Sequence, residues 1–347
     1  MTADVYVLGL LWVGLTLYVL LGGADFGGGV WDLLAIGSRG GRQRDLISGA
    51  IAPVWEANHV WLIFVLTGLL AAFPTVFADL SVALYVPFSL VLLGIVFRGA
   101  AFAFRAHGDR DSPWVRTWTR VFGVASLISP FLLGAAAASI ASGRIRVVDG
   151  EVQAGLLDAW TSPLSLFAGL FAVAICAYLA ATYLVIEAAD RGDRELERDF
   201  RARATAAGVV AGALAAVGIL VVHTQAPVLW DGMTRRGLPF VLLSALGGVA
   251  SLAALARGGN RMARVAAAIA VGAVLWGWGA AQWPYLVVPD VTAEEAAAPA
   301  TTMRLVAIGF TLGGLLLAPS LLALFRVFKM GHSKGDREAA STAPRAG

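Results

Sequence analysis

The sequence predicts an all-α polytopic membrane protein, and three observations support this fold class. Hydrophobic residues make up 59% of the 347 residues and charged residues only 14%, whereas a soluble domain is nearer half apolar and a quarter charged. Nine apolar stretches are long enough to cross a bilayer as helices. The 40 glycines and 11 tryptophans are typical of packed membrane helices, because small residues permit close approach and tryptophan favours the lipid interface. A soluble globular protein is therefore excluded.

We expect a single integral membrane domain over residues 1–330, built as two four-helix bundles plus one peripheral helix. The apolar stretches are continuous and rich in Ala, Leu and Gly, unlike the short alternating strands of a membrane barrel. The nine expected helices cover residues 5–36, 46–73, 76–104, 120–142, 162–188, 204–223, 238–256, 263–286 and 303–328. The polar segment 331–347 is expected to be a disordered cytoplasmic tail.

The basic residues predict how the chain lies across the membrane. Of the 26 Lys and Arg, 20 follow odd-numbered segments and five follow even-numbered ones. Because short cytoplasmic loops carry the excess of positive charge, we expect the N-terminus outside and the C-terminus in the cytoplasm. The net charge of +3 is spread between apolar segments, which excludes a nucleic-acid-binding face. The short loops and the lack of a phosphate-binding motif argue against an ATP-driven pump.

Two acidic residues lie within the first apolar segment, in the sequence GGADFGGGVWDLL. Asp25 and Asp32 are seven residues apart, so they share nearly the same helix face. The surrounding glycines allow a neighbouring helix or water to approach the backbone. A charge at membrane depth is costly unless it is paired or hydrated, so both residues are candidates for function. The alternative is that the glycines only pack and that Asp32 lies at the cytoplasmic interface.

The second segment, in IAPVWEANHVWLI, holds the densest polar cluster of the chain: Trp55, Glu56, Asn58, His59 and Trp61. Glu56 and His59 are i,i+3 neighbours on a helix, so a carboxylate and an imidazole can share a proton or flank a polar group of another helix. Two alternatives stay open. The cluster lies at the headgroups, with tryptophans as anchors, or His59 is a packing residue.

Arg98, in LVLLGIVFRGAAFAFR, is the one arginine that we place inside a span. A buried guanidinium must find a carboxylate or carbonyl groups, and Asp25, at a compatible depth, is the expected partner. The alternative is an arginine that snorkels to the cytoplasmic surface. Glu187 and His223 lie at segment ends and are interpreted as interfacial residues.

These segments resemble the second subunit of the cytochrome bd-type quinol oxidases. GGADFGGGVWDLLA is similar to the family's Gly-x-Asp-Phe-Gly-x-Gly element, IAPVWEANHVWLIFVLTGLLAAFP to its Pro-x-Trp-[Asp/Glu]-x-Asn-x-Val-Trp-Leu signature, and ALYVPFSLVLLGIVFRGAAFAFR to its third helix. Beyond about residue 130 the resemblance is mainly one of helix count and spacing. Glu56, Ala57 and His59 stand where the commoner signature has Asp, Gly, and Gln or Glu, which suggests a divergent branch.

The resemblance implies a subunit of a quinol:oxygen oxidoreductase of the bacterial cytoplasmic membrane. It implies a heterodimer with a homologous first subunit that carries haems b and d and the quinol site. A small single-helix subunit, and a quinone or lipid bound against this chain, stay open. This chain is expected to stabilise the haem subunit and to help line a proton path through Asp25 and Glu56, with Arg98 tuning Asp25. An ion pair favours the charged form of Asp25, which makes Glu56 the better relay. Polar-cluster or partner-contact residues are expected to be Trp55, Asn58, His59, Trp61 and Asp32.

We expect no haem or metal on this chain itself. Its single cysteine, Cys176, excludes a disulfide framework, a cysteine zinc site and an iron–sulfur cluster. His107, His223 and His332 lie in or near loops or segment ends, so His59 has no second histidine for a bis-histidine haem within the membrane.

Two other classes remain open. A proton-coupled secondary transporter also places Asp, Glu and Arg between glycine-rich helices, and an inverted repeat would favour it; the sequence shows no clear one. A noncatalytic membrane scaffold would be favoured if Asp25, Glu56 and Arg98 could be neutralised without loss of activity. The match over three successive helices disfavours the transporter, and the cost of buried charge disfavours the scaffold.

Overall fold

The structure, a computed structural model, describes residues 2–52, 55–106, 108, 112–317, 319–320 and 323. Among these residues, nine helices are long and apolar enough to cross a membrane. The prediction of an all-α polytopic membrane fold is thus confirmed. The expected tail at 331–347, the end of the ninth segment, His107 and His332 lie outside the described residues.

The first four spans form one bundle. Its first span, Ala3–Leu33, is continuous, but a π-helical turn, η1, interrupts the α-helical hydrogen bonding just before the acidic segment. The elements of this bundle are α1 (Ala3–Leu17), η1 (Tyr18–Gly22), α2 (Gly23–Leu33), α3 (Gly40–Ile51), α4 (Trp55–Ala72), α5 (Pro74–Ala83), α6 (Tyr85–Ala106) and α7 (Pro113–Ala141).

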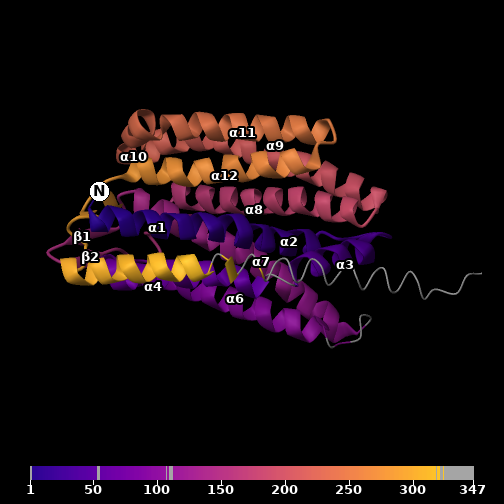
Figure 1. Cartoon of the computed structure of the whole chain (residues 1–347), viewed down its shortest axis with the longest axis horizontal. Coiled ribbons are helices and arrows are strands. Elements are labelled where there is room, and N and C mark those ends of the chain that lie inside the picture. The colour runs from indigo at the N-terminus through magenta and orange to yellow at the C-terminus, as the bar shows by residue number, and fades with distance from the viewer. Residues whose placement is uncertain are drawn as a thin grey trace, which may run out of the picture.

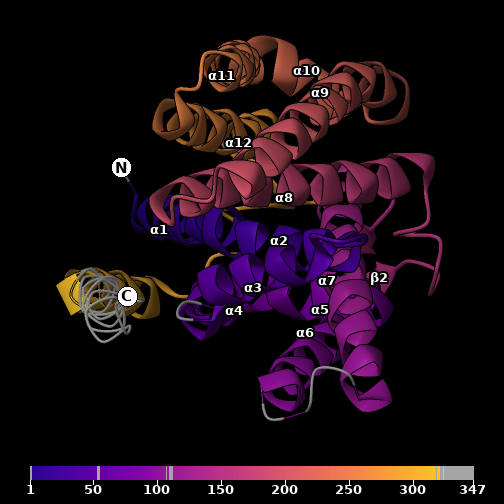
Figure 2. The ribbon, with the colours of Figure 1, turned by 90° about the vertical axis from the view of Figure 1, so that its right-hand side faces the viewer.

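The next four spans form a second bundle, which Figure 2 shows above the first. Its elements are α8 (Pro163–Asp190), α9 (Arg194–Gln225), α10 (Pro227–Gly232), η2 (Met233–Gly237), α11 (Leu238–Ala256) and α12 (Asn260–Gln282). The two bundles meet at α8, which packs against α9 on one side and against α2 and α7 on the other. The arrangement matches the expected pair of four-helix bundles.

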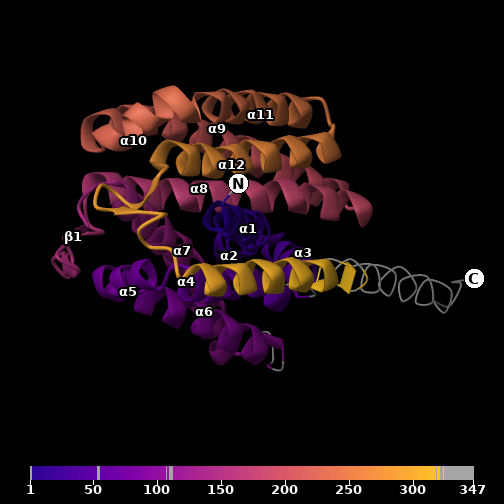
Figure 3. The ribbon, with the colours of Figure 1, turned by 60° about the vertical axis from the view of Figure 1, so that its left-hand side comes forward.

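The last helix, Ala300–Leu317, lies at the periphery and runs beside the first bundle (Figure 3). The rings of Phe64 on α4 and Phe310 stack with centroids 4.5 Å apart. Tyr6 on α1 and Thr311 share a hydrogen bond of 2.8 Å. The chain therefore returns from the second bundle to the first, and the ninth span closes against α1 and α4.

Two short antiparallel hairpins lie at the end of the molecule where α1 begins (Figure 1). They are β1 (Arg146–Val148) with β2 (Glu151–Gln153), and β3 (Tyr285–Val287) with β4 (Val291–Thr292). Arg146 binds Asp290 through two hydrogen bonds of 2.7 and 2.9 Å. These bonds hold the pKa of Asp290 below its usual range. The pair ties the loop after α7 to the loop after α12.

Two expected spans differ from the observed helices. The segment 46–73 contains two helices, since α3 ends at Ile51 and α4 begins at Trp55. The segment 76–104 likewise contains α5 and α6, which meet at Leu84. Both breaks occur inside continuously apolar sequence, where hydropathy gives no signal. Pro74 marks the start of α5 because a proline lacks the N–H that a preceding turn would require.

The charged stretch after α8 is a correction to the expected loop. We expected a linker before a helix at residue 204, but α9 begins at Arg194. Asp193 caps this helix, since its carboxylate accepts a hydrogen bond of 3.1 Å from the backbone N–H of Leu196. Gly192, with φ of +72°, makes the turn from α8. The linker is thus a helix cap followed by the polar first turns of α9.

Candidate functional site

Glycine places α2 deep between its neighbours. A Cβ at Gly27 would lie 1.8 Å from the carbonyl oxygen of Cys176 on α8, so only glycine permits this approach. The indole Nε1 of Trp31 donates a hydrogen bond of 2.8 Å to the carbonyl of Ala177. These contacts hold Asp25, which is 3% exposed, inside the first bundle.

Asp25 and Arg98 form a buried ion pair between α2 and α6. The Nη2 atom of Arg98 lies 3.7 Å from Oδ1 of Asp25 and donates a hydrogen bond of 3.2 Å to its backbone carbonyl. The guanidinium also lies over the rings of Phe26 and Phe122, at 4.4 and 5.1 Å, which stabilises a cation away from water. Arg98 is 2% exposed, so it does not snorkel to the surface.

A second ion pair joins the same two helices, seven residues further along each of them. Oδ1 of Asp32, whose side chain is fully buried, accepts a hydrogen bond of 3.0 Å from Nη2 of Arg105. The guanidinium of Arg105 lies 5.0 Å from the Phe122 ring, so this ring is shared by both arginines. The expected helix ended at residue 104, but α6 continues past it, and Arg105 lies in its last turn.

The sequence held a signal for this arrangement. Asp25 and Asp32 are seven residues apart, and so are Arg98 and Arg105. Equal spacing on two helices that run in the same direction brings the residues together as two rungs. Asp32 is therefore a buried, paired residue rather than a free interfacial one.

The polar cluster of α4 is divided between two faces. Asn58 is buried and donates a hydrogen bond of 3.4 Å to the carbonyl of Leu21. His59 is half-buried, and its ring lies 6.1–6.2 Å from the rings of Tyr18, Phe26 and Trp55. These two residues face the acidic helix and pack inside the bundle.

Glu56, three residues before His59 on α4, is the exposed member of the cluster. Its side chain is exposed, and it forms no ion pair within the described part of the chain. The structure therefore brings together Asp25, Asn58, His59 and Arg98 but leaves Glu56 on the outer face of α4. The two tryptophans of the cluster pack against phenylalanines, Trp55 on Phe102 and Trp61 on Phe64.

Sequence reasoning did not identify Tyr18 as part of this region. Its side chain is 4% exposed and packs in a small cluster with Phe26 and Cys176. The π-helical turn that begins at Tyr18 sets this side chain toward His59. No sequence pattern marks the turn, because its residues, YVLLG, are as apolar as the flanking helix.

The described residues do not fit a haem held by two histidines. His59 lies on α4 in the first bundle, whereas His223 lies near the end of α9 in the second, in edge-to-face contact with Trp230 at 4.7 Å between ring centroids. No group of three or more His, Cys, Asp or Glu side chains that could hold a metal ion occurs among the residues that the structure describes.

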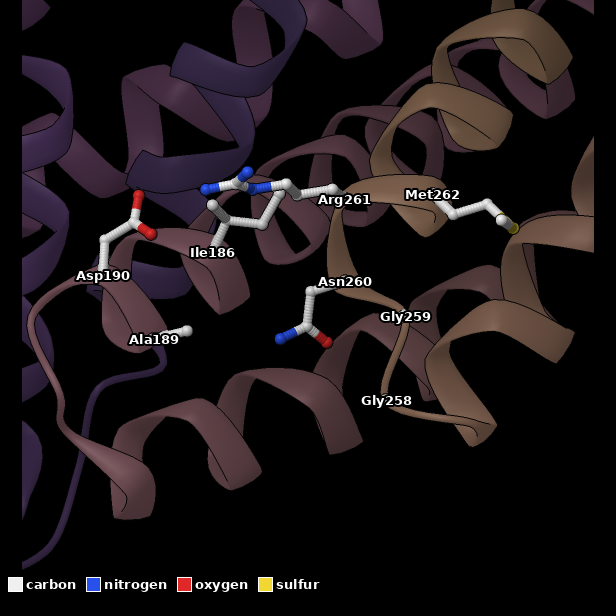
Figure 4. A pocket seen from close by; sticks show the side chains of 8 residues that line it. All are labelled: Ile186, Ala189, Asp190, Gly258, Gly259, Asn260, Arg261 and Met262. Atoms are coloured by element: carbon white, nitrogen blue, oxygen red, sulfur yellow. The ribbon is translucent and has the colours of Figure 1, made fainter.

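A pocket of about 330 Å³ lies in the second bundle, between the end of α8 and the start of α12 (Figure 4). Charged and apolar side chains line it together, with Asp190 and Arg261 at its edge. None of the site residues expected from the sequence lines this pocket. The buried acids and arginines of the first bundle therefore remain the candidate site.

Residues 3–328 match the family model described as cytochrome bd terminal oxidase subunit II. The chain belongs to this family. The match confirms the resemblance that rests on three motifs in the first third of the sequence, and it extends that resemblance across the nine spans.

Curated relatives carry the same description. The chain is 34% identical to cytochrome bd ubiquinol oxidase subunit 2 of Bacillus subtilis over 159 residues, which are 46% of each protein. It is 30% identical to the Escherichia coli bd-I ubiquinol oxidase subunit 2 over 209 residues, 58% of this chain and 53% of the relative. It is 21% identical to a putative menaquinol oxidase subunit II of Bacillus subtilis over 94% of this chain and 96% of the relative. The first two matches thus span about half the length of those relatives.

A solved structure has the same fold. A chain of the bd oxidase from Geobacillus thermodenitrificans superposes with a TM-score of 0.77 and 24% identity, over 94% of this chain and 99% of that one.

Proposed function

We propose that this chain is the non-haem subunit of a bd-type oxidase in the bacterial cytoplasmic membrane, which oxidises quinol and reduces oxygen to water. Its family and the names of its relatives support the activity. In this proposal the homologous first subunit holds haems b and d and the quinol site. The haems would supply electron transfer and oxygen reduction. This chain would supply a surface that stabilises the haem subunit, and side chains that carry protons.

The exposed carboxylate of Glu56 carries the proposal. It lies on the outer face of α4, a helix apolar enough to cross a membrane. A charge at that position is costly in lipid and is favourable only where a protein partner or water meets it. The face of α4 with Glu56 is therefore the face we assign to the haem subunit.

The two acids have different roles in this proposal. Asp25 is held in a buried ion pair with Arg98. Glu56 is exposed and has no ion-pair partner within the described residues. Glu56 is then the relay from the cytoplasm, and the Asp25–Arg98 pair holds α2 and α6 in place behind it.

Substitution Glu56→Gln tests the proposal. It removes the titrating group and keeps the shape of the side chain. We expect quinol-driven oxygen consumption to fall at least tenfold, as is usual for the loss of a proton-transfer group, while haem content and complex yield stay unchanged. Oxygen consumption by the purified complex, with its reduced-minus-oxidised spectrum, measures both.

The matched control is Glu187→Gln, at the end of α8. Glu187 forms an exposed i,i+4 pair of 3.0 Å with Arg191, and such pairs contribute little. Normal turnover by a fully assembled Glu56→Gln complex would remove Glu56 from the proton path. It would favour the scaffold role for this chain.

A further inference from the structure

The interior of the first bundle contains polar atoms that make no hydrogen bond to a protein group, although Oδ1 of Asp25 lies in the ion pair with Arg98. The hydroxyl of Tyr18, both carboxylate oxygens of Asp25, both ring nitrogens of His59, and Nε and Nη1 of Arg98 are buried and make no hydrogen bond within the described part of the chain. These atoms come from η1, α2, α4 and α6. Four elements thus contribute unsatisfied groups to one interior.

The groups lie together around the ring of Phe26. The guanidinium of Arg98 lies 4.4 Å from this ring, and the imidazole of His59 lies 6.1 Å from it. The His59 and Tyr18 rings are also 6.1 Å apart, and Asp25 lies 3.7 Å from Arg98. The unsatisfied atoms therefore form one cluster, which we name the Phe26 cluster: Tyr18, Asp25, Phe26, His59 and Arg98.

The cost of leaving these atoms unpaired is large. A buried polar atom without a hydrogen-bond partner destabilises the fold, and a charged one does so more strongly. Native proteins therefore pair nearly all such groups, with ordered water where protein groups do not reach. Seven such atoms in one cluster demand a ligand that can satisfy them.

The chemistry of the cluster selects the ligand. Asp25 only accepts hydrogen bonds when ionised, Arg98 only donates them, and a neutral imidazole and a hydroxyl do both. The carboxylate of Asp25 would repel a bound anion, and the guanidinium of Arg98 would repel a bound cation. The ion pair therefore disfavours both kinds of ion. A small neutral molecule that donates and accepts is favoured, and water is that molecule.

We infer that the Phe26 cluster binds ordered water, which joins the carboxylate of Asp25 to the imidazole of His59 and the hydroxyl of Tyr18. This water links the first span to α4 inside the bundle. Its use in proton transfer rests on the proposed function: His59 is three residues from Glu56 on α4, so the water would give Asp25 a route toward the same helix that bears the relay.

Radiolytic labelling of the wild-type complex tests the site. A brief X-ray pulse generates hydroxyl radicals from bound water as well as from bulk water, so a buried side chain is oxidised only if water lies beside it. In H₂¹⁸O, the label is read by mass spectrometry. Phe26 is 2% exposed and Phe73 is 0% exposed, and Phe73 packs in an apolar cluster. We expect ¹⁸O labelling at Phe26 and His59 several-fold above that at Phe73. Equal, background labelling at all three residues overturns the inference.

A second measurement removes one partner of the water. In the infrared difference spectrum, O–H stretching bands of bound water shift in H₂¹⁸O. We expect such bands in the wild-type complex and a changed set in Tyr18→Phe. The matched control is Tyr178→Phe on α8, because the hydroxyl of Tyr178 already donates a hydrogen bond to Ser251. Water bands that are identical in both variants and the wild type contradict the site.

These readouts are independent of turnover. A labelled Phe26 with normal turnover in Glu56→Gln supports the water site and contradicts the proposed proton path. An unlabelled Phe26 with slow turnover in Glu56→Gln does the reverse.

Discussion

At the scale of single residues, the Asp25–Arg98 pair is the most demanding feature of the chain. Both side chains are 2% exposed, and the arginine is compensated by one carboxylate, one carbonyl and two aromatic rings. Removing one partner of a buried pair leaves an uncompensated charge and costs about 3–5 kcal/mol, whereas removing both often costs less.

A double-mutant cycle measures this coupling. We expect Asp25→Asn and Arg98→Gln each to lower the apparent Tm of the purified complex, and the double variant to lower it by less than the sum of the two. The coupling energy should reach about 1–3 kcal/mol, as for residues in direct contact. Strict additivity of the two changes in Tm would show that the residues do not act as a pair.

Gly27 makes the close approach of α2 to α8 possible, and its substitution is the sharpest packing test. A Cβ there would overlap the Cys176 carbonyl at 1.8 Å, so Gly27→Ala must push the helices apart, at a cost of about 1–3 kcal/mol or more. We expect a lower Tm and a lower yield of assembled complex.

Gly9→Ala is the control for that substitution. Gly9 lies on α1, and a Cβ there meets nothing within 4 Å. Alanine is favoured over glycine in a helix, so Tm should stay unchanged or rise slightly. A Gly27→Ala complex as stable as the Gly9→Ala complex would contradict the close α2–α8 packing.

The sequence indicated the pairing of Asp25 with Arg98 but not which way Glu56 faces. A buried guanidinium needs a carboxylate or carbonyl partner, and few carboxylates lie within the spans. The pairing of Arg98 with Asp25 could therefore be inferred from the sequence. The outward position of Glu56 was not predictable, because Glu56, Asn58 and His59 all lie within the first turns of α4 and the sequence does not show which of them faces the bundle interior. The water-lined setting of Tyr18 depends on a π-helical turn that leaves no trace in hydropathy.

At the scale of elements, α3 is held to the second bundle by charge rather than by apolar packing alone. Arg42 on α3 lies 2.6 Å from Asp193 and 2.9 Å from Glu195, and Arg39 lies 3.2 Å from Asp199. These ion pairs join the end of the first span to the start of α9. They add to the Asp193 cap, which begins α9 within the charged stretch.

This attachment should depend on pH. The hydrogen bond from Arg42 holds the pKa of Asp193 below its usual range. A carboxylate with a lowered pKa in the folded state adds stability above its unfolded pKa of about 3.9, and that stability is lost as the pH falls through the lowered value. We expect the hydrogen-exchange protection factors of α3, corrected for intrinsic rates, to fall as the medium is acidified below about pH 4.

Arg42→Gln separates this cause from general acid effects. The variant returns the pKa of Asp193 toward its usual range and should show low protection of α3 at neutral pH, with little further loss in acid. A substitution of Arg194, which forms no ion pair among the described residues, should keep the wild-type profile. The same acid response in Arg42→Gln and the wild type would rule out the Asp193 contact as its origin.

At the scale of the whole molecule, hydropathy predicted the nine spans, because bilayer thickness sets helix length. It did not predict that the ninth helix returns to α1 and α4. That contact depends on the packing of Phe64 against Phe310. The sequence of either segment alone does not show that these two rings meet. Hydropathy also did not mark the divisions between α3 and α4 and between α5 and α6.

The orientation of the molecule in the membrane follows from how the arginines are distributed between its two ends. Figure 1 shows α3, the α8–α9 connection and the α11–α12 connection at one end, and both β-hairpins with the start of α1 at the other. The first end bears most of the arginines, so we propose that it faces the cytoplasm. The N-terminus would then lie outside.

Cysteine accessibility tests this orientation in intact cells. Cys176 is the single cysteine of the sequence and is buried, so Cys176→Ser gives a background without thiols. Onto it we would place Gln153→Cys in β2 and Arg194→Cys at the start of α9, both exposed positions at opposite ends of α8. A membrane-impermeant maleimide should label Gln153→Cys in intact cells and Arg194→Cys only after permeabilisation. The reverse pattern would invert the orientation and place Glu56 on a path from the outside, because α4 begins at the same end as α9.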